Sequence, residues 1–193
     1  GVQVCIGDVC REYPQRRDAG ELTLSGALSS PVSVRADTTG EYAWSRDAAP
    51  AGPRVRLEAS GGEVEAFALE TCVPQPIAVT GDWSQRLDQR MPGQDVELTW
   101  SNPQPGARVY LRMTTGVATH GGVAHAEIEC EGPDAGRLVL PGAFLDRLYE
   151  TGWACGECGF NTLYRFFAVR GQAGAIPIEW RITTQAVFSH IPR

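Results

Sequence analysis

The chain has 193 residues, a formal net charge of −6 and 17 basic residues, all of which are arginine. An acidic chain without a basic run is a poor electrostatic match for nucleic acid or anionic lipid, so both classes of partner are excluded. No apolar stretch is long enough to span a bilayer, and a hydrophobic content of 42% indicates a folded chain.

Residues 1–75 are expected to form a small antiparallel β-domain. Short segments with apolar residues at every second position recur between turn residues, as in the pair Leu22 and Leu24. The expected strands cover residues 21–26, 31–36, 41–45, 53–60 and 61–70. The segment TCVPQP at 71–76 is the expected junction to the second half of the chain.

Residues 76–193 are expected to form an immunoglobulin-like β-sandwich, because many short strands there show alternating burial. The expected strands cover residues 77–81, 95–100, 107–114, 123–130, 136–140, 162–169 and 176–188. One short helix is inserted near 141–150, where apolar residues recur at helical spacing after a proline. The polar segment 81–95 is expected to be an exposed loop. The predicted fold class is therefore all-β, and a single larger sandwich is the alternative.

Six cysteines are an even and high number for a chain of this length, which indicates a disulfide framework. In VCIGDVC, the pair Gly7-Asp8 suits a two-residue hairpin turn. This turn would bring Cys5 and Cys10 opposite each other, within disulfide distance. Persistent disulfides would place the protein in an oxidising compartment.

Two further bridges complete this framework. A local one is expected between Cys155 and Cys158, in a glycine-rich segment. The remaining pair, Cys72 with Cys130, would close a long loop, which is the kind of bridge that stabilises most in the chain-entropy model. A bridge from Cys130 to Cys155 or to Cys158 is the alternative.

The segment TGWACGECGF, residues 151–160, also allows a redox motif or half of a zinc site. A redox C-x-x-C lies at a helix start, whereas the following TLYRFFAV indicates a strand, and Glu157 adds a negative charge between the sulfurs. Four cysteines would provide the sulfur ligands of a zinc site, Cys5, Cys10, Cys155 and Cys158. The two pairs lie far apart in the chain, so disulfides are favoured.

A second candidate for an ion site follows the loop after residue 114. His120 and His125 flank a Gly-Gly turn, and Glu127 continues along the same strand face. Ordinary cross-strand ion pairs explain this acidic stripe more simply, because Arg108 and Arg112 have outward parity on the preceding strand. No metal or other cofactor is therefore expected.

Aromatic residues are the candidates for ligand contact. Trp83 and Trp153 lie in segments that read as loops, where aromatic rings bind sugars and partner proteins, and a ring folded back onto the core is the alternative. No nucleophile motif, P-loop or dinucleotide fingerprint occurs in the chain. A catalytic site is not expected from sequence, although the carboxylate pair of a glycoside hydrolase can be assembled from distant positions.

The order of elements resembles that of the exported, uncharacterised β-rich lipoproteins of high-GC Gram-negative bacteria. The stretches that carry this resemblance are SGGEVEAFALE, ELTWSNPQPGARVYL and EIECEGPDAGRLVLPGAFLDRL. The resemblance covers much of residues 20–170 and implies a location in the cell envelope without a defined activity. The residue pattern VQVC lacks the small residue expected before a lipidated cysteine.

Together these patterns favour a non-enzymatic protein that is secreted, periplasmic or associated with the outer membrane. It would bind an unknown protein or glycan partner, or act structurally. Two alternatives remain open: a metal-binding protein that uses cysteines or the His/Glu region, and a carbohydrate-active or other hydrolase whose carboxylates converge in space.

Overall fold

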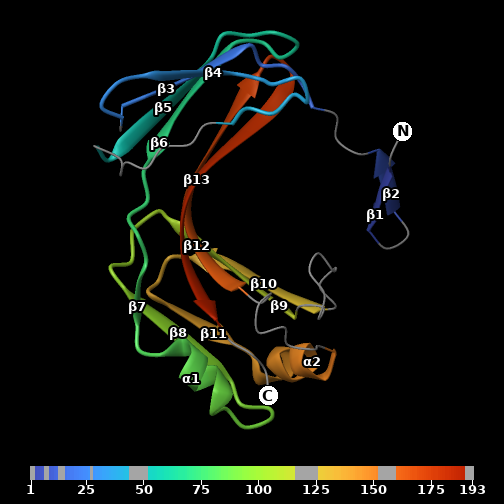
Figure 1. Cartoon of the computed structure of the whole chain (residues 1–193), viewed down its shortest axis with the longest axis vertical. Coiled ribbons are helices and arrows are strands. Elements are labelled where there is room, and N and C mark those ends of the chain that lie inside the picture. The colour runs from blue at the N-terminus through green and yellow to red at the C-terminus, as the bar shows by residue number, and fades with distance from the viewer. Residues whose placement is uncertain are drawn as a thin grey trace. The chain divides into compact units, whose positions relative to one another are not determined.

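The computed structural model describes residues 3–6, 9–12, 16–26, 28–43, 52–115, 126–151 and 160–189. This part of the chain is mostly β-strand, with antiparallel pairing and two short helices (Figure 1). The expected all-β class is therefore confirmed. The chain forms two compact units, the first from Gly1–Thr71 with Val169–Trp180 and the second from Cys72–Ala168 with Arg181–Arg193.

The first unit contains a four-stranded sheet with the strand order β4-β3-β5-β6. Its strands are β3 (Glu21–Ser25), β4 (Val32–Arg35), β5 (Arg54–Ala59) and β6 (Phe67–Cys72). Every second residue of β5 is buried, as the alternation in its sequence predicts. The strand expected at 41–45 is not formed at 41–43, where the Tyr42 hydroxyl donates to the carbonyl of Gly20 and holds the segment as a loop.

A separate hairpin is formed by β1 (Gln3–Ile6) and β2 (Val9–Glu12). Cys5 lies directly opposite Cys10, and Ile6 lies opposite Val9. The register expected from the Gly7-Asp8 turn is therefore confirmed. The side chains of the two cysteines lie outside the described part of the structure.

The longest strands, β12 (Phe160–Ala173) and β13 (Ile176–Ser189), form a hairpin that belongs to both units. Its tip packs on β6 in the first unit: a Cβ added at Gly171 would lie 2.6 Å from Cδ2 of Leu69. Ala173 is accordingly buried. The expected boundary after residue 75 lies close to the border between the units, but the tip joins the first unit without any indication in the sequence.

The second unit contains two antiparallel sheets with the strand orders β10-β9-β12-β13 and β11-β8-β7. The remaining strands are β7 (Ala78–Thr80), β8 (Val96–Ser101), β9 (Arg108–Thr115), β10 (Ala126–Pro133) and β11 (Arg137–Leu140). Both sheets contribute side chains to one hydrophobic cluster, which includes Leu98, Trp100, Leu111, Met113, Leu140 and Leu163.

Helix α1 (Trp83–Asp88) replaces the exposed loop expected at 81–95. The Asp82 carboxylate accepts from the backbone N–H of Gln85 at 2.9 Å and caps the first turn. Trp83 and Leu87, one helical turn apart, are buried in the hydrophobic cluster. Although the segment is polar in composition, these two residues and hydrogen bonds from Trp83 and Arg86 to carbonyls of β8 attach the helix to the second unit.

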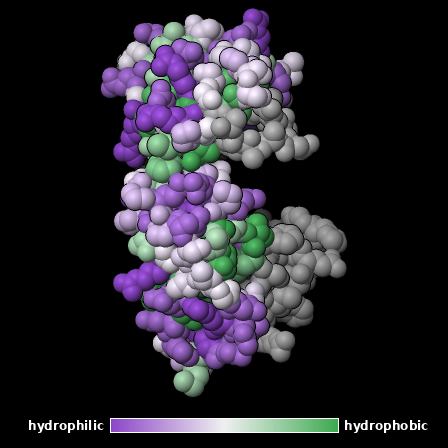
Figure 2. Space-filling model, turned by 90° about the vertical axis from the view of Figure 1, so that its left-hand side faces the viewer, coloured by the Kyte–Doolittle hydropathy of each residue, from purple (hydrophilic) through white to green (hydrophobic). Residues whose placement is uncertain are grey.

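Helix α2 (Gly142–Thr151) agrees with the helix expected near 141–150. Leu145 and Leu148 are buried, whereas Phe144, which shares their helical spacing, is 57% exposed. Neither helix is long and apolar enough to cross a membrane, and the described residues include no other that is. On the side of the molecule drawn in Figure 2, hydrophilic residues predominate and hydrophobic residues gather in small patches.

Candidate functional site

The outer face of the sheet β10-β9-β12-β13 carries the most varied chemistry in the second unit. On β9, Val109, Leu111 and Met113 are buried in the hydrophobic cluster, so the alternate residues Arg108, Tyr110 and Arg112 point outward. In register, Tyr110 lies opposite Glu131 on β10 and Tyr164 on β12. We call this surface the tyrosine face, with the members Arg108, Tyr110, Arg112, Glu127, Glu129, Glu131 and Tyr164.

Ion pairs join β9 to β10 along the tyrosine face. Arg108 Nε lies 2.8 Å from Glu131 Oε1, and Arg112 contacts both oxygens of Glu127. The guanidinium of Arg112 lowers the pKa of the Glu127 carboxyl, and Glu127 in turn raises the pKa of Arg112. The cross-strand pairing expected for this acidic stripe is therefore present.

The same ion pairs bear on the metal site considered from sequence. Glu127 is held by Arg112, and within the described residues no group of three or more His, Cys, Asp or Glu side chains could hold a metal ion. His120 and His125 lie outside the described residues. Glu127, the carboxylate considered as a ligand beside His120 and His125, is thus engaged in an ion pair.

Two tyrosines from neighbouring strands form the centre of the face. The ring centroids of Tyr110 and Tyr164 are 5.9 Å apart with an angle of 31° between the planes. The Tyr110 hydroxyl is hydrogen-bonded to Glu129 on the adjacent strand. Burial of the hydroxyl, and then this bond to a carboxylate, raises the pKa of Tyr110 to about 12. The hydroxyl therefore stays protonated and donates to Glu129 throughout the physiological range.

Next to the tyrosines, the guanidinium group of Arg181 covers a third aromatic ring, that of Phe166. Phe166 has the same outward parity as Tyr164 on β12, yet it is only 2% exposed. The guanidinium of Arg181 on β13 lies over its ring, 4.9 Å from the centroid, and reaches toward Glu131 at 3.8 Å. The aromatic surface that solvent reaches on this part of β12 is therefore that of Tyr164.

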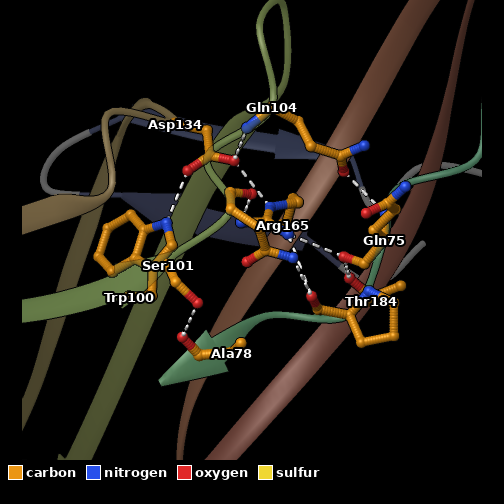
Figure 3. A network of polar contacts seen from close by, with 10 residues as sticks. Gln75, Ala78, Trp100, Ser101, Gln104, Asp134, Arg165 and Thr184 are labelled. Atoms are coloured by element: carbon orange, nitrogen blue, oxygen red, sulfur yellow. Dashed lines mark hydrogen bonds and ion pairs between the residues drawn. The ribbon is translucent and has the colours of Figure 1, made fainter. Parts of the chain in front are cut away.

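A buried polar network lies on the opposite side of β12 and fixes the strand (Figure 3). Arg165, which alternates with Tyr164 and Phe166, lies with its Nε 2.7 Å from Asp134 Oδ2, an ion-pair contact rather than a well-aligned hydrogen bond. Neither side chain is exposed. Asp134 also accepts from Trp100 Nε1 at 2.7 Å.

The guanidinium of Arg165 ties three loop carbonyls to the same strand. Its Nη1 donates to the carbonyl oxygens of Gln75 at 2.9 Å and Pro76 at 3.2 Å, and its Nη2 donates to that of Asn102 at 2.9 Å. Asn102 has a φ of 56° and is the one non-glycine residue in the described chain with a positive φ. The network thus anchors both the junction between the units and the β8–β9 loop to β12.

Of the two readings of Trp83 from sequence, a ligand-contact aromatic or a ring folded back onto the core, the structure contradicts the first and shows the second. Trp83 is 2% exposed, its indole N–H donates to the Thr99 carbonyl, and its ring contacts those of Trp100 and Phe188. The helix around it turns the ring into the core. Trp153, the second candidate, lies outside the described residues.

The cysteines differ from the expected framework at one described pair. Cys72 and Cys130 are both free thiols, so the bridge expected between them is not formed. Cys130 packs against the hydrophobic cluster, and burial raises the pKa of its thiol. Residues 152–159, with Cys155 and Cys158, lie outside the described part of the chain.

Among the described residues, open hollows also lie away from the tyrosine face, and the polar side chains that line them are largely engaged within the chain. One, of about 330 Å³, is lined in part by Arg86 and Asp95, which bind the Glu97 carbonyl and the Gly142 N–H. The other, of about 310 Å³, is lined by residues that include Asp18, whose carboxylate accepts from Tyr42. The described lining of either hollow contains no histidine or cysteine, and the Ser60 hydroxyl in the second accepts from the Glu21 N–H.

Comparison of the chain with protein-family models, with curated proteins and with solved structures found no significant match. What the chain can do therefore rests on its own geometry. The tyrosine face is the part of the described structure where aromatic rings, carboxylates and guanidinium groups meet on a solvent-facing sheet. The charges of the face are visible in the sequence, and the alternation in ARVYLRMT and TLYRFFAV predicts that Tyr110 and Tyr164 each point outward. That the two residues are neighbours follows only from the pairing of β9 with β12.

Proposed function

We propose that the chain is a non-enzymatic protein of the cell envelope or the exterior, which binds a partner through the tyrosine face. The observation that carries this proposal is the Tyr110–Tyr164 pair held within a ladder of ion pairs. A tyrosine ring combines a large contact area with a hydroxyl that forms hydrogen bonds, which suits a surface that binds a partner. Arg165 and Asp134 support the face from behind and keep β12 rigid.

We further propose that the second unit is an immunoglobulin-like sandwich. With β7, β8, β9, β10, β11, β12 and β13 lettered A, B, C, C′, E, F and G, its sheets read A-B-E and C′-C-F-G. Immunoglobulin domains have strands A, B and E in one sheet and C, F and G in the other, and variable-type domains add C′ to the second. This strand order supports the proposal, and the tyrosine face then lies on the C′-C-F-G sheet.

A location outside the cytosol is proposed from the cysteines. The pairing of Cys5 opposite Cys10 in a sheet of only two strands favours a disulfide there, because two strands contribute little stability of their own in water. A disulfide of this kind persists only in an oxidising compartment.

Hydrolysis is less well supported than binding. The neighbouring carboxylates Glu127 and Glu129 are occupied by Arg112 and by the Tyr110 hydroxyl, so neither is presented as a free acid or base. A metal-binding role would have to rest on residues other than Glu127.

A sedimentation assay with a purified envelope fraction from a Gram-negative bacterium tests the proposal. The wild-type protein should pellet with the fraction, and Tyr164→Ala should remain in the supernatant. Phe144→Ala is the matched control, because Phe144 is an exposed aromatic residue on α2 away from the tyrosine face. Near-ultraviolet circular dichroism verifies that both variants are folded. Equal sedimentation of Tyr164→Ala and wild type, or no sedimentation of either, would contradict the proposal.

A further inference from the structure

We infer that the ligand of the tyrosine face is a neutral glycan, an inference that rests on the proposed binding function. The face offers two aromatic rings surrounded by groups that bind hydroxyls, and its charges cancel one another. Each of these features has a separate consequence for what the face can recognise.

The charges on the face are balanced and fixed in place. The three carboxylates of the face, Glu127, Glu129 and Glu131, meet its two guanidinium groups, Arg108 and Arg112, and a third at its border on β13, Arg181; most are engaged in pairs. A surface with no net charge gives little long-range attraction to a polyanion or a basic partner. Its polar atoms suit a ligand that forms hydrogen bonds without carrying charge.

Among the described residues, Arg108 and Glu129 retain hydrogen-bonding capacity. A carboxylate has about four lone-pair sites and a guanidinium has five N–H donors, so the internal bonds of these two side chains leave further positions available. Arg108 uses its Nε for Glu131, and Glu129 receives the Tyr110 hydroxyl. Sugar hydroxyls both donate and accept, which matches such a mixture of donors and acceptors. Because the internal pairs hold these side chains, little conformational entropy is lost on binding.

The tyrosines add a surface for the apolar side of a sugar ring. Tyr110 lies opposite Glu131 in register, yet its hydroxyl reaches Glu129 two residues along the neighbouring strand. The ring is therefore inclined along the sheet. Tyr110 and Tyr164 are half-buried neighbours, with ring centroids 5.9 Å apart and 31° between the planes, and the exposed parts of the two rings would contact the C–H face of a pyranose.

A protein partner fits the face less well. Protein interfaces have a fully buried apolar centre inside a polar rim. The apolar side chain at this position, Phe166, is only 2% exposed beneath Arg181 and offers no such centre. The accessible centre of the face is formed by the half-buried tyrosines, whose polar edges suit a hydroxyl-rich ligand.

Affinity gel electrophoresis with four neutral polysaccharides, dextran, galactomannan, mannan and β-1,3-glucan, tests this inference, with anionic alginate for comparison. We expect at least one neutral polysaccharide to retard the wild type and Phe144→Ala equally, with little change in retardation on raising the salt concentration. Tyr164→Ala should lose about tenfold in apparent affinity, which corresponds to about 1.4 kcal/mol, within the range of aromatic contacts. Tyr110→Phe should keep most of the affinity, because the ring is retained.

Three results would overturn the inference: no retardation by any neutral polysaccharide, salt-sensitive retardation by alginate alone, or equal retardation of Tyr164→Ala. The sedimentation assay separates this inference from the proposed function. If wild type sediments with the envelope fraction and Tyr164→Ala does not, but no neutral polysaccharide retards the protein, the face is a binding site for another class of partner. If Tyr164→Ala sediments like wild type, the binding function itself is wrong.

Discussion

Arg165 and Asp134 form an ion pair in which neither side chain is exposed to solvent, with Nε 2.7 Å from Oδ2. The pair is surrounded by further partners, because Asp134 accepts from Trp100 and from the Gln104 N–H, and Arg165 donates to three carbonyls. A buried pair is stabilising only with such additional hydrogen bonds, since taking each charge out of water costs several kcal/mol. The network therefore makes the second unit sensitive to the loss of either partner.

Arg165→Met is expected to lower the free energy of unfolding by about 3–5 kcal/mol, because it leaves the Asp134 carboxylate buried without its cation. Asp134→Asn should also be destabilising, because it leaves the Arg165 guanidinium buried without its carboxylate. Urea unfolding followed by tryptophan fluorescence measures the change. Arg137→Met is the control in the same unit, since Arg137 is 70% exposed and 3.8 Å from Glu97, and it should cost about 1 kcal/mol or less. If Arg165→Met and Arg137→Met lowered the free energy of unfolding by similar amounts, the buried network would contribute nothing to stability.

Tyr110 should titrate well above the ordinary pKa of a tyrosine, because burial and Glu129 raise its pKa to about 12. The ultraviolet absorbance of tyrosinate measures this step, and Tyr110→Phe should remove it. Glu129→Gln should shift it only part of the way back, since burial is the larger cause. A single tyrosine step near the ordinary pKa of about 10 would contradict the prediction.

The same shift makes stability depend on pH in the alkaline range. The folded state favours neutral Tyr110, so its contribution is complete below the unfolded pKa of about 10 and is lost as the pH rises towards about 12. Wild type should therefore lose more stability than Tyr110→Phe between these two values. Equal losses in urea unfolding at both ends of the range would argue against the shift.

The start of α2 tolerates no side chain at Gly142. A Cβ at this position would lie less than 3.0 Å from the backbone of Gly93 and Gln94, and backbone atoms cannot move aside cheaply. Gly142→Ala should therefore destabilise by about 1–3 kcal/mol or more, as overpacking does. Gly132→Ala on β10 is the control, because nothing lies within 4 Å of its added Cβ. Thermal unfolding compares the two variants, and equal melting temperatures would refute the expected clash.

Disulfides at Cys5–Cys10 and Cys155–Cys158 would leave two thiols, Cys72 and Cys130. Alkylation of the denatured, unreduced protein should thus add two labels, and reduction should add two hydrogens per bridge to the intact mass. In the folded protein Cys130 should react slowly, because burial raises its pKa. Six labels without reductant would remove both bridges and, with them, the argument for an oxidising compartment.

Local pattern was sufficient for the strands and for part of the candidate site. The alternation in ARVYLRMT and AHAEIEC predicts that the arginines of β9 and the glutamates of β10 share a face, and Arg108–Glu131 and Arg112–Glu127 pair as expected. The two-residue turn at Gly7-Asp8 predicts the register of the first hairpin. Such inferences succeed because the period of a strand and the length of a turn are properties of neighbouring residues.

Contacts between distant segments were decided by the tertiary structure alone. Trp83 reads as a loop residue because its segment is polar, yet an N-cap at Asp82 and the core beyond it fold a helix that buries the ring. The partnership of Asp134 with Arg165, and the meeting of Tyr110 with Tyr164, join strands separated by long stretches of chain. Sequence by itself determined which residues alternate and where the chain turns. The packing of the whole core decides which strands become neighbours, and so which side chains form a site. The reason is that the free energy of burial is shared among residues far apart in the chain.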